Sequence, residues 1–447
     1  MSRLWKKFAV RTGLAALDPG VKRRLGAEYF YLRMYSSDIL AAPVDDLEIL
    51  DNLDRAKNSG AIDLSQGTAN LSGLFPLAEI MGVVSGQPDI IKSLQHYPPA
   101  FGQRAALDAV AKKIAADTGV SYDPRSEILL CNGASQGLAH ALDCFVDPGE
   151  SIVLLDPCYL FYSWLAQTRG VKIRRVRGPR VNEGVNEGVN EGFNDRVDQG
   201  RLKRAMRGAK AIIVNSPANP DGSMIHPDDL QLIADLAKRY NCVILSDEVY
   251  SGFCWERNFT SIASLPAAWD RTVVISSLSK SHGLPGLRAG WCAGPGNLIR
   301  PLAMLMSIRV PCVSAAVQAA LSDLIAAEND FAPKRRTEFL RRRESAISAA
   351  RSAGLTVQSP DGAFYLWAQV PSGFSSGHEF TRWCLESCGV LVMAGEPFGP
   401  SGKSMVRLSW GGASEPGKDF REAMARIAMI TQHASAQNKP GLSPGDV

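Results

Sequence analysis

Three patterns are missing from the sequence, and each absence removes a class of protein from consideration. The nine cysteines form no CxxC pair and the six histidines form no HxxxH pair, which argues against a disulfide framework and against a metal site. No apolar run is long enough to span a membrane, and charged residues such as Arg11 and Asp18 interrupt the stretch where a secretion signal would stand. We therefore expect a cytoplasmic protein with reduced cysteines, no metal and no membrane contact.

The chain also lacks a strong excess of charge. A formal net charge of +4 over 447 residues is small for a protein that binds nucleic acid. The densest basic run, residues 334–343, contains Glu338, and we interpret it as a solvated helix face. A regulator that keeps an enzyme-like domain as a ligand sensor would need an N-terminal DNA-binding domain of about 60–70 residues. Residues 1–60 show no helix-turn-helix pattern, so the regulator is a minor alternative.

What the sequence does have is a series of short apolar runs that alternate with helical stretches. The clearest runs are 128–131, 152–155, 211–214, 243–246 and 273–275. Each run is continuously apolar, which is typical of strands buried on both faces of a parallel sheet. The pattern predicts an α/β fold with helices on both faces of the sheet. In such sheets ligands bind at the carboxyl ends of the strands.

Lys280 stands close after one of these strands, within the segment 277–288. A lysine at the end of a buried strand is well placed to form a Schiff base with a carbonyl cofactor such as pyridoxal 5′-phosphate. Ser277 and Arg288 would supply a hydroxyl and a guanidinium group for the phosphate. The competing interpretation is an ordinary strand-to-loop junction with a solvated lysine.

Other strand ends carry further candidates. Asp247 closes a buried strand and needs a partner, which a protonated pyridine nitrogen, an arginine or the backbone would provide. Tyr250, three residues on, is placed to reach the same ring from its oxygen side. Asn219 lies between two prolines that form a rigid turn and aim its amide. Tyr159 follows another strand and would either stack on a planar cofactor or pack in the core.

The stretch 132–137 follows the first strand and opens an apolar helix. Its small residues, Ala134 and Ser135 among them, allow backbone N–H groups to approach a phosphate at the helix N-terminus. Alone, this stretch is equally compatible with a plain strand–turn–helix connection. Together, the four strand ends and this helix start offer the parts of one site in an order that fits a single cofactor.

With these motifs the chain resembles the fold-type I pyridoxal-phosphate enzymes, specifically the class I/II aminotransferase superfamily, from about residue 63 to 430. The resemblance implies a large domain with a mostly parallel seven-stranded sheet flanked by helices, and a smaller α+β domain from the N- and C-terminal segments. We place an N-terminal arm and part of the small domain at 1–70, the large domain at 71–310 and the rest of the small domain at 311–435. Residues 436–447 are polar, and we expect a disordered tail.

The same resemblance implies roles for individual residues. Lys280 would bind pyridoxal phosphate and later act as the base at the substrate Cα, Arg407 would clamp the α-carboxylate, and Gly67 would lie beside it. Tyr97 matches a tyrosine that family members lend to the phosphate of the neighbouring subunit, which implies a homodimer with shared active sites. The remaining cofactor contacts would come from Ala134, Ser135, Tyr159, Asn219, Asp247, Tyr250, Ser277 and Arg288.

The reaction that we expect is transamination of an L-α-amino acid. An alternative arises because the loops 277–286 and 247–252 are similar to those of 1-aminocyclopropane-1-carboxylate synthases, which use S-adenosylmethionine. Those enzymes carry Ala-Glu-Asn after the N-terminal glycine, whereas this chain continues from Gly67 with Thr-Ala-Asn. The missing glutamate argues against a cyclopropane-forming enzyme and leaves open γ-elimination or γ-replacement on S-adenosylmethionine. The sequence does not select the amino acid.

A tetrapeptide, Val-Asn-Glu-Gly, begins at 181 and is repeated without change at 185 and at 189, so that three copies fill residues 181–192. Such a polar, glycine-rich duplication is typical of an expanded surface loop, and we assign it no catalytic role.

Overall fold

The computed structural model describes residues 59–71, 94–179, 196–412 and 418–437, with a few single positions between 52 and 82. Most of the predicted N-terminal arm and the whole Val-Asn-Glu-Gly repeat lie outside the described residues. The predicted tail also lies outside them, except for its first two residues, which end helix α16 (Lys418–Gln437). No helix in the described ranges is long and apolar enough to cross a membrane.

The large lobe is built on a seven-stranded sheet with the order β2-β8-β7-β6-β5-β3-β4. Only β8 runs antiparallel to its neighbours; the pairs formed by the other strands are parallel. The strands are β2 (Ile128–Cys131), β3 (Ser151–Asp156), β4 (Lys172–Arg177), β5 (Ala211–Asn215), β6 (Val243–Asp247), β7 (Thr272–Ser277) and β8 (Gly290–Ala293). The predicted α/β fold with a mostly parallel seven-stranded sheet is therefore confirmed.

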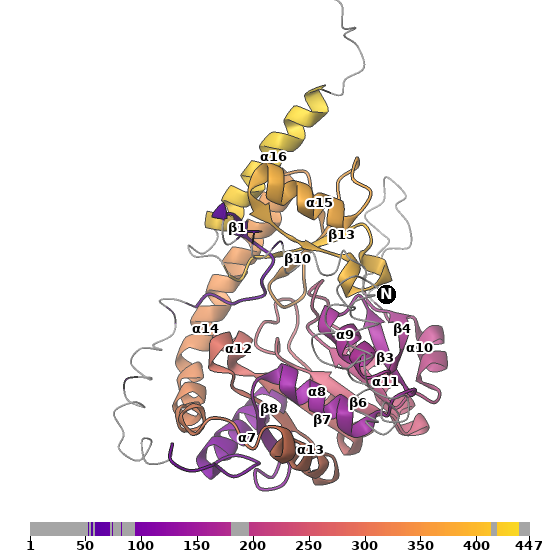
Figure 1. Cartoon of the computed structure of the whole chain (residues 1–447), viewed down its shortest axis with the longest axis vertical. Helices are drawn as coiled ribbons and strands as arrows, with labels where there is room; N and C mark the ends of the chain where they lie inside the picture. The colour runs from indigo at the N-terminus through magenta and orange to yellow at the C-terminus, as the bar shows by residue number, and fades with distance from the viewer. Residues whose placement is uncertain are drawn as a thin grey trace, which may run out of the picture.

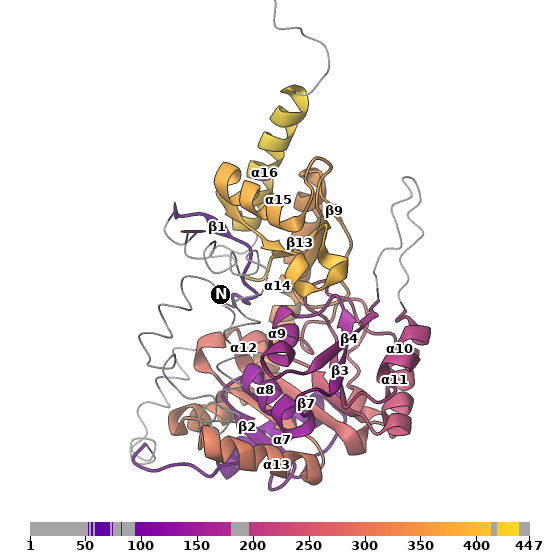
Figure 2. The same cartoon turned by 45° about the vertical axis from the view of Figure 1, so that its right-hand side comes forward.

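Helices cover both faces of this sheet, as Figures 1 and 2 show. Neighbouring strand residues point to opposite faces, so Leu154 packs in the core on one side and Val153 in the core on the other. The first side carries α7 (Arg104–Thr118), α8 (Ala134–Phe145), α9 (Leu160–Thr168) and α13 (Gly296–Arg309), and the second carries α10 (Gln199–Met206) and α11 (Pro227–Tyr240). Burial on both faces explains why the inner parallel strands are mostly apolar, whereas β4, at an edge of the sheet, is not.

The small lobe is built on a four-stranded antiparallel sheet with the order β12-β13-β10-β9. Its strands are β9 (Thr356–Val357), β10 (Tyr365–Gln369), β12 (Met393–Ala394) and β13 (Met405–Ser409). Helix α15 (Gly377–Trp383), which continues into a π-helical turn (Cys384–Cys388), and α16 pack with it. The N-terminal segment joins this lobe, because β1 (Ile62–Asp63) pairs with β11 (Val390–Leu391). The predicted domain boundaries stay a prediction.

Short helical turns complete the described part of the chain. Between β6 and β8 these are η2 (Ile262–Ser264), η3 (Trp269–Arg271), α12 (Leu278–Ser281) and η4 (Pro285–Leu287). Before β13 they are η6 (Glu396–Phe398) and η7 (Pro400–Gly402). Of these turns, α12 bears on function, because it carries Lys280 directly after β7.

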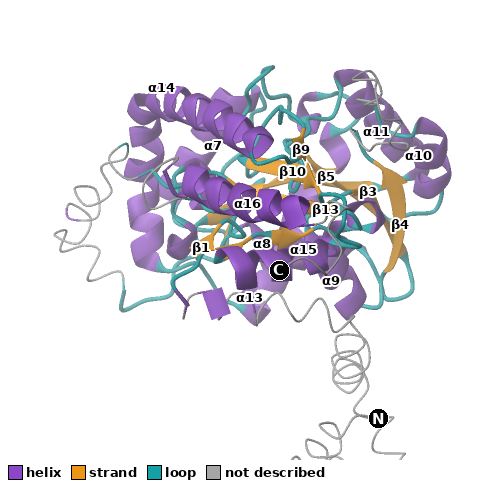
Figure 3. Cartoon of the chain, turned by 90° about the horizontal axis from the view of Figure 1, so that it is seen from above, coloured by secondary structure: helices purple, strands orange, loops and turns teal. Residues whose placement is uncertain are grey.

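One helix, α14 (Ala315–Ser352), extends through both lobes (Figure 1) and packs on α7 at one end and beside α16 at the other. Figure 3 shows α14 and α16 together from above. The interpretation of 334–343 as a solvated face is wrong for Arg335, Arg342 and Arg343, which are 4%, 2% and 5% exposed. Arg342 pairs with Glu338 at 2.8 Å and donates to the carbonyl of Asn70. Partners on the same helix and in the N-terminal segment therefore compensate a buried charge that looks solvated in the sequence.

Candidate active site

A cavity of about 540 Å³ lies at the carboxyl ends of the parallel strands and is also lined by residues of the small lobe. It brings together eleven of the twelve residues that the sequence singled out. These are Gly67, Ala134, Ser135, Tyr159, Asn219, Asp247, Tyr250, Ser277, Lys280, Arg288 and Arg407. The predicted location at the strand ends is therefore the one that the structure has.

Of the twelve predicted site residues, Tyr97 is the one that does not line the cavity. Its side chain is 85% exposed, and it is absent from the lining. Its predicted role in a neighbouring subunit stays a prediction.

Lys280 lies in α12, a single helical turn that begins directly after β7. Ser277 caps the turn, because its hydroxyl oxygen accepts from the backbone N–H of Ser279. The Lys280 ammonium group donates to the carbonyl oxygen of Gly67, which comes from the N-terminal segment. Burial, followed by the positive charge of Arg407, lowers the pKa of Lys280 to about 8. Such a lysine gives up its proton far more readily than a solvated one.

Gly67 is required for steric reasons. A Cβ atom at this position would lie 2.0 Å from the hydroxyl oxygen of Tyr365, so any larger residue would displace that ring. Tyr365 was missed by the sequence analysis. Its hydroxyl lies 2.6 Å from that of Tyr250, and burial raises the pKa of both phenols, so both stay protonated at neutral pH.

Asp247 ends β6 and is buried. Its carboxylate accepts from the Tyr162 hydroxyl at 2.5 Å and from the backbone N–H of Val249 at 3.3 Å. No ion pair to a lysine or arginine is formed with it in the part of the chain that the structure describes. Burial raises its pKa, and a cation brought close to it would reverse that shift. Tyr162 was also missed, although its spacing of three from Tyr159 at the start of α9 places both rings on one side.

Asn219, in the large lobe, and Arg407, in the small lobe, are joined by a hydrogen bond. Asn219 Oδ1 accepts from Arg407 Nη1 at 2.7 Å, and Arg407 Nη2 donates to the carbonyl of Ser65. The guanidinium carbon lies 4.5 Å from the centre of the Tyr365 ring, which fixes the plane of the fork. Because the oxygen of Asn219 is engaged, its amide nitrogen is the group that remains to donate to a cofactor oxygen.

The opposite end of the cavity is built to hold an anion. Helix α8 begins at Ala134, so the N–H groups of Ala134 and Ser135 belong to the first turn, which has no intrahelical acceptor. Arg288 donates to the carbonyls of Pro285 and Asn132 at 2.8 and 3.1 Å. These bonds hold its guanidinium against Gly133, where a Cβ would meet Nη2 at 2.2 Å. A cation and a helix start therefore converge on one point.

The donor set fits pyridoxal phosphate. Asp247 offers an anion to a ring nitrogen, while Arg288 and the start of α8 offer donors to a phosphate. Lys280 lines the same cavity and has a lowered pKa. The described residues contain no group of three or more His, Cys, Asp or Glu side chains that could hold a metal ion.

The sequence is similar to known aminotransferases over most of its length. The family model described as aminotransferase class I and II matches residues 62–427. Arginine–pyruvate transaminase of Pseudomonas aeruginosa is 31% identical over 76% of this chain and 84% of its own. Aspartate aminotransferase of Pyrococcus abyssi is 29% identical over 75% of this chain and 84% of its own.

Solved structures of the same kind share the fold. An aromatic aminotransferase from Pyrococcus horikoshii superposes with a TM-score of 0.75 at 27% identity, covering 86% of this chain and 99% of that one. For N-succinyldiaminopimelate aminotransferase from Mycobacterium tuberculosis the TM-score is 0.76 at 26% identity, with 90% and 99% covered. The names of these relatives give no support to the use of S-adenosylmethionine.

Proposed function

Because the chain belongs to the aminotransferase class I and II family, we propose that its cavity holds pyridoxal phosphate and transfers the amino group of an L-α-amino acid. The observation that carries the proposal is the placement of Lys280. This lysine has a lowered pKa and shares one cavity with Asp247, Arg288 and Arg407. A nucleophilic amine, an anion for the ring nitrogen, a cation for the phosphate and a cation for the substrate are thus all present.

When bound, pyridoxal phosphate supplies an electron-accepting ring that stabilises negative charge on the substrate Cα. Asp247 would pair with the ring nitrogen and would favour its protonated form. Lys280 Nζ takes the proton from the substrate Cα, and its lowered pKa suits it to this exchange near neutral pH. The hydroxyl of Tyr250 and the amide nitrogen of Asn219 would hold the ring oxygen by donating hydrogen bonds to it.

Arg407 orients the substrate. Its guanidinium binds the α-carboxylate through the donors that Asn219 and Ser65 do not use. Stacking of the guanidinium over Tyr365 keeps the fork from turning. The carboxylate is thereby held in one direction, which aims the Cα–H bond at Lys280.

We further propose that the substrate carries an uncharged side chain. The charged residues that line the cavity, in the described ranges, are Asp247, Lys280, Arg288 and Arg407, and each already has a role. The rest of the wall includes Tyr159, Leu160, Phe161 and Met393. A wall of this kind would leave a second carboxylate or an ammonium group of the substrate without a partner.

A homodimer with shared sites is part of the proposal. Tyr97 is exposed, and so are three apolar side chains at the end of α13 and just beyond it: Met304, Ile308 and Val310. The stretch before α7 reaches this region, because the backbone N–H of Gln103 donates to the side chain of Gln318 at 2.6 Å, and Gln318 in turn donates to the carbonyl of Val313. The exposed apolar side chains of α13, together with the exposed Tyr97, suit contact with a second copy of the chain.

The test is an absorbance titration of the purified protein with amino acids and with S-adenosylmethionine. We expect a band of lysine-bound cofactor that shifts to the shorter-wavelength band of the aminated cofactor on addition of amino acids with uncharged side chains, and release of the keto acid. A preference for aspartate or arginine would refute the proposed substrate class alone. Release of methylthioadenosine from S-adenosylmethionine would favour the γ-elimination alternative, and absence of any cofactor band would refute the proposed function.

A further inference from the structure

Arg335 lies on α14 and contacts two segments that carry active-site residues. Its Nη1 donates to the carbonyl of Ser281 at 2.5 Å, and its Nη2 lies 3.5 Å from the carbonyl of Gly252. Ser281 follows Lys280 directly, and Gly252 comes two residues after Tyr250. One buried cation thus joins the segment of the proposed base to the segment of a proposed cofactor ligand.

The contact at Ser281 supplies a hydrogen-bond donor to a carbonyl at the end of α12. Helix α12 is only four residues long, and the last carbonyls of any helix have no partner within the helix. The carbonyl of Lys280 is satisfied by the N–H of Gly283. The carbonyl of Ser281 is satisfied by Arg335. The turn that carries Lys280 is therefore fixed at its start by Ser277 and at its end by a side chain from another helix.

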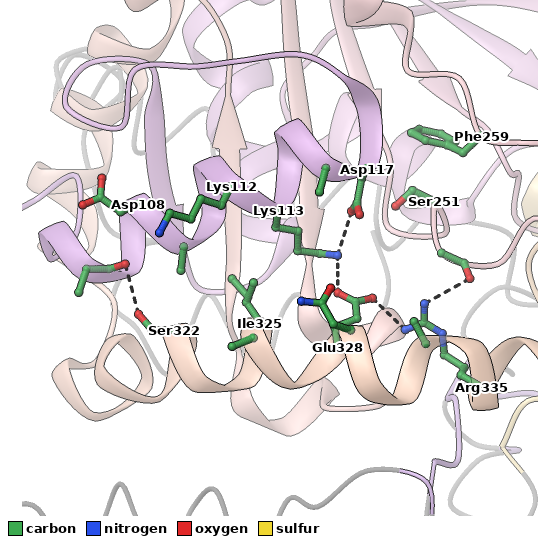
Figure 4. A pocket seen from close by; sticks show the side chains of 17 residues that line it. Asp108, Lys112, Lys113, Asp117, Ser251, Phe259, Ser322, Ile325, Glu328 and Arg335 are labelled. Atoms are coloured by element: carbon green, nitrogen blue, oxygen red, sulfur yellow. Dashed lines mark hydrogen bonds and ion pairs between the residues drawn. The ribbon is translucent and has the colours of Figure 1, made fainter.

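Glu328 lies seven residues before Arg335, on the same side of α14, and holds Arg335 in place. Its carboxylate lies 3.0 Å from Arg335 Nη1 and also pairs with Lys113 on α7. Lys113 pairs in turn with Asp117 at 2.9 Å. Figure 4 shows these side chains pointing toward one another between the two helices. We call Lys113, Glu328 and Arg335 the α7–α14 ion network.

The α7–α14 ion network is buried and charged. The side chains of Lys113, Glu328 and Arg335 are 9%, 12% and 5% exposed. Burial alone would raise the pKa of Glu328, but the neighbouring cations, Lys113 first among them, lower it to about 2. Burial lowers the pKa of His282, whose ring lies 3.8 Å from Glu328, to about 4. The network therefore keeps its charges at neutral pH while His282 is neutral.

A buried ion network contributes little net stability, because the loss of hydration offsets the attraction between its charges. What it does supply is a fixed geometry. It also lines a second cavity, of about 700 Å³ between α7 and α14, which shares no lining residue with the active-site cavity. Arg335 thus lines this second cavity and is not among the residues that line the active-site cavity.

We propose that Arg335 is a positioning residue for Lys280, and that Glu328 and Lys113 hold Arg335 against α12. The inference rests on the proposed function, because the position of Lys280 affects the reaction only if Lys280 has the role proposed above. Without the guanidinium, the last turn of α12 loses its partner at Ser281, and the ammonium group of Lys280 moves relative to Arg407 and Asp247. A displacement of about 1 Å in such a group is enough to slow a reaction by about a hundredfold.

The test compares Arg335→Met with Arg336→Met. Arg336 is a matched control, because it is the next residue on α14 and also donates to backbone carbonyls, but to those of Cys254 and Trp255. For Arg335→Met we expect kcat to fall about tenfold or more, with KM for the amino acid changed less than about twofold. For Arg336→Met we expect both constants to stay near the wild-type values. Arg335→Lys is expected to recover part of kcat.

A second measurement does not depend on turnover. Hydrogen exchange of the backbone over 278–284, measured without cofactor, is expected to be faster in Arg335→Met than in the wild type and in Arg336→Met. If Arg335→Met does not fold, Glu328→Gln tests the same network with Arg335 present and is expected to change kcat and exchange in the same direction. Equal effects in the Arg335 and Arg336 variants, or wild-type kcat and exchange in the Arg335 variant, would overturn the proposal. A wild-type protein that binds no cofactor would refute the proposed function instead, while the exchange result would still decide whether Arg335 fixes α12.

Discussion

Asn219 Oδ1 accepts a hydrogen bond from Arg407 Nη1 at 2.7 Å, and this bond joins a residue of the large lobe to one of the small lobe. The two residues are assigned to different ligands, the cofactor and the substrate carboxylate. Because both side chains are buried, a shift of one displaces the other. Binding of the cofactor and binding of the substrate are therefore expected to be coupled.

Asn219→Ala is therefore expected to weaken both ligands. Loss of a hydrogen bond to a charged group costs about 1.5–3 kcal/mol, which corresponds to about a tenfold to hundredfold rise in KM for the amino acid. The dissociation constant of the cofactor, measured by absorbance titration of the apoprotein, should rise in the same variant. Asn297→Ala, at an exposed position, is the control. An effect on KM alone would contradict the assignment of Asn219 to the cofactor.

Lys280→Ala is expected to remove the absorbance band of lysine-bound cofactor and all measurable turnover, because no other lysine lines the cavity in the described ranges. Lys112→Ala, which changes an exposed lysine on α7, should retain both. Full activity in the Lys280 variant would show that the central assignment is wrong.

The rate at which the apoprotein takes up pyridoxal phosphate covalently should depend on pH. Lys280 reacts as the free amine, so the rate should rise with pH and level off above about 8, far below the usual 10.5. Since Arg407 contributes to the lowering, Arg407→Ala should move the midpoint to higher pH. The same variant should weaken amino-acid binding while the cofactor is retained. An unchanged midpoint in that variant would contradict the electrostatic coupling between the two residues.

Gly67→Ala is expected to disturb the pair formed by Tyr365 and Tyr250. The added Cβ would lie 2.0 Å from the Tyr365 hydroxyl, and overpacking of this kind costs about 1–3 kcal/mol. We expect a lower melting temperature and a lower kcat/KM. Gly286→Ala, where a Cβ meets no atom within 4 Å, is the control and should change neither quantity.

Mixed dimers would test the role of Tyr97. If Tyr97 of one subunit serves the site of its partner, Tyr97→Ala and Lys280→Ala homodimers are both impaired, whereas a mixed dimer has one site with both residues intact. Mixing the two variants in equal amounts should restore about a quarter of the wild-type activity, because about half of the dimers are mixed. Absence of restoration, with dimer formation verified by sedimentation, would place Tyr97 outside the site.

Sequence reasoning located the residues that lie at strand ends, because continuous apolar runs mark the strands and the first polar residues after them mark the site. It missed β4, which carries four basic residues at an edge of the sheet. It also missed Tyr162 and Tyr365. Their roles depend on contacts to Asp247 and Tyr250 across 85 and 115 residues of chain, and no local pattern records such pairings.

The buried arginines of α14 also could not be predicted from local sequence patterns. A run rich in Arg and Glu has the composition of a solvated helix face, and nothing local distinguishes it from one. Only the packing of α14 against α7 and against the active-site loops turns Arg335 and Arg342 inward.

Helix α14 contains Pro333 in its interior. Proline lacks the N–H that the helix needs at that point, so the backbone is weakest there against bending. Glu328 and Arg335 stand on either side of Pro333 and tie this stretch to α7 and to α12. Helix α14, which links the two lobes, is therefore held by ion pairs and hydrogen bonds at the point where it bends most easily. The side chains that hold it there are the ones that we propose to position Lys280.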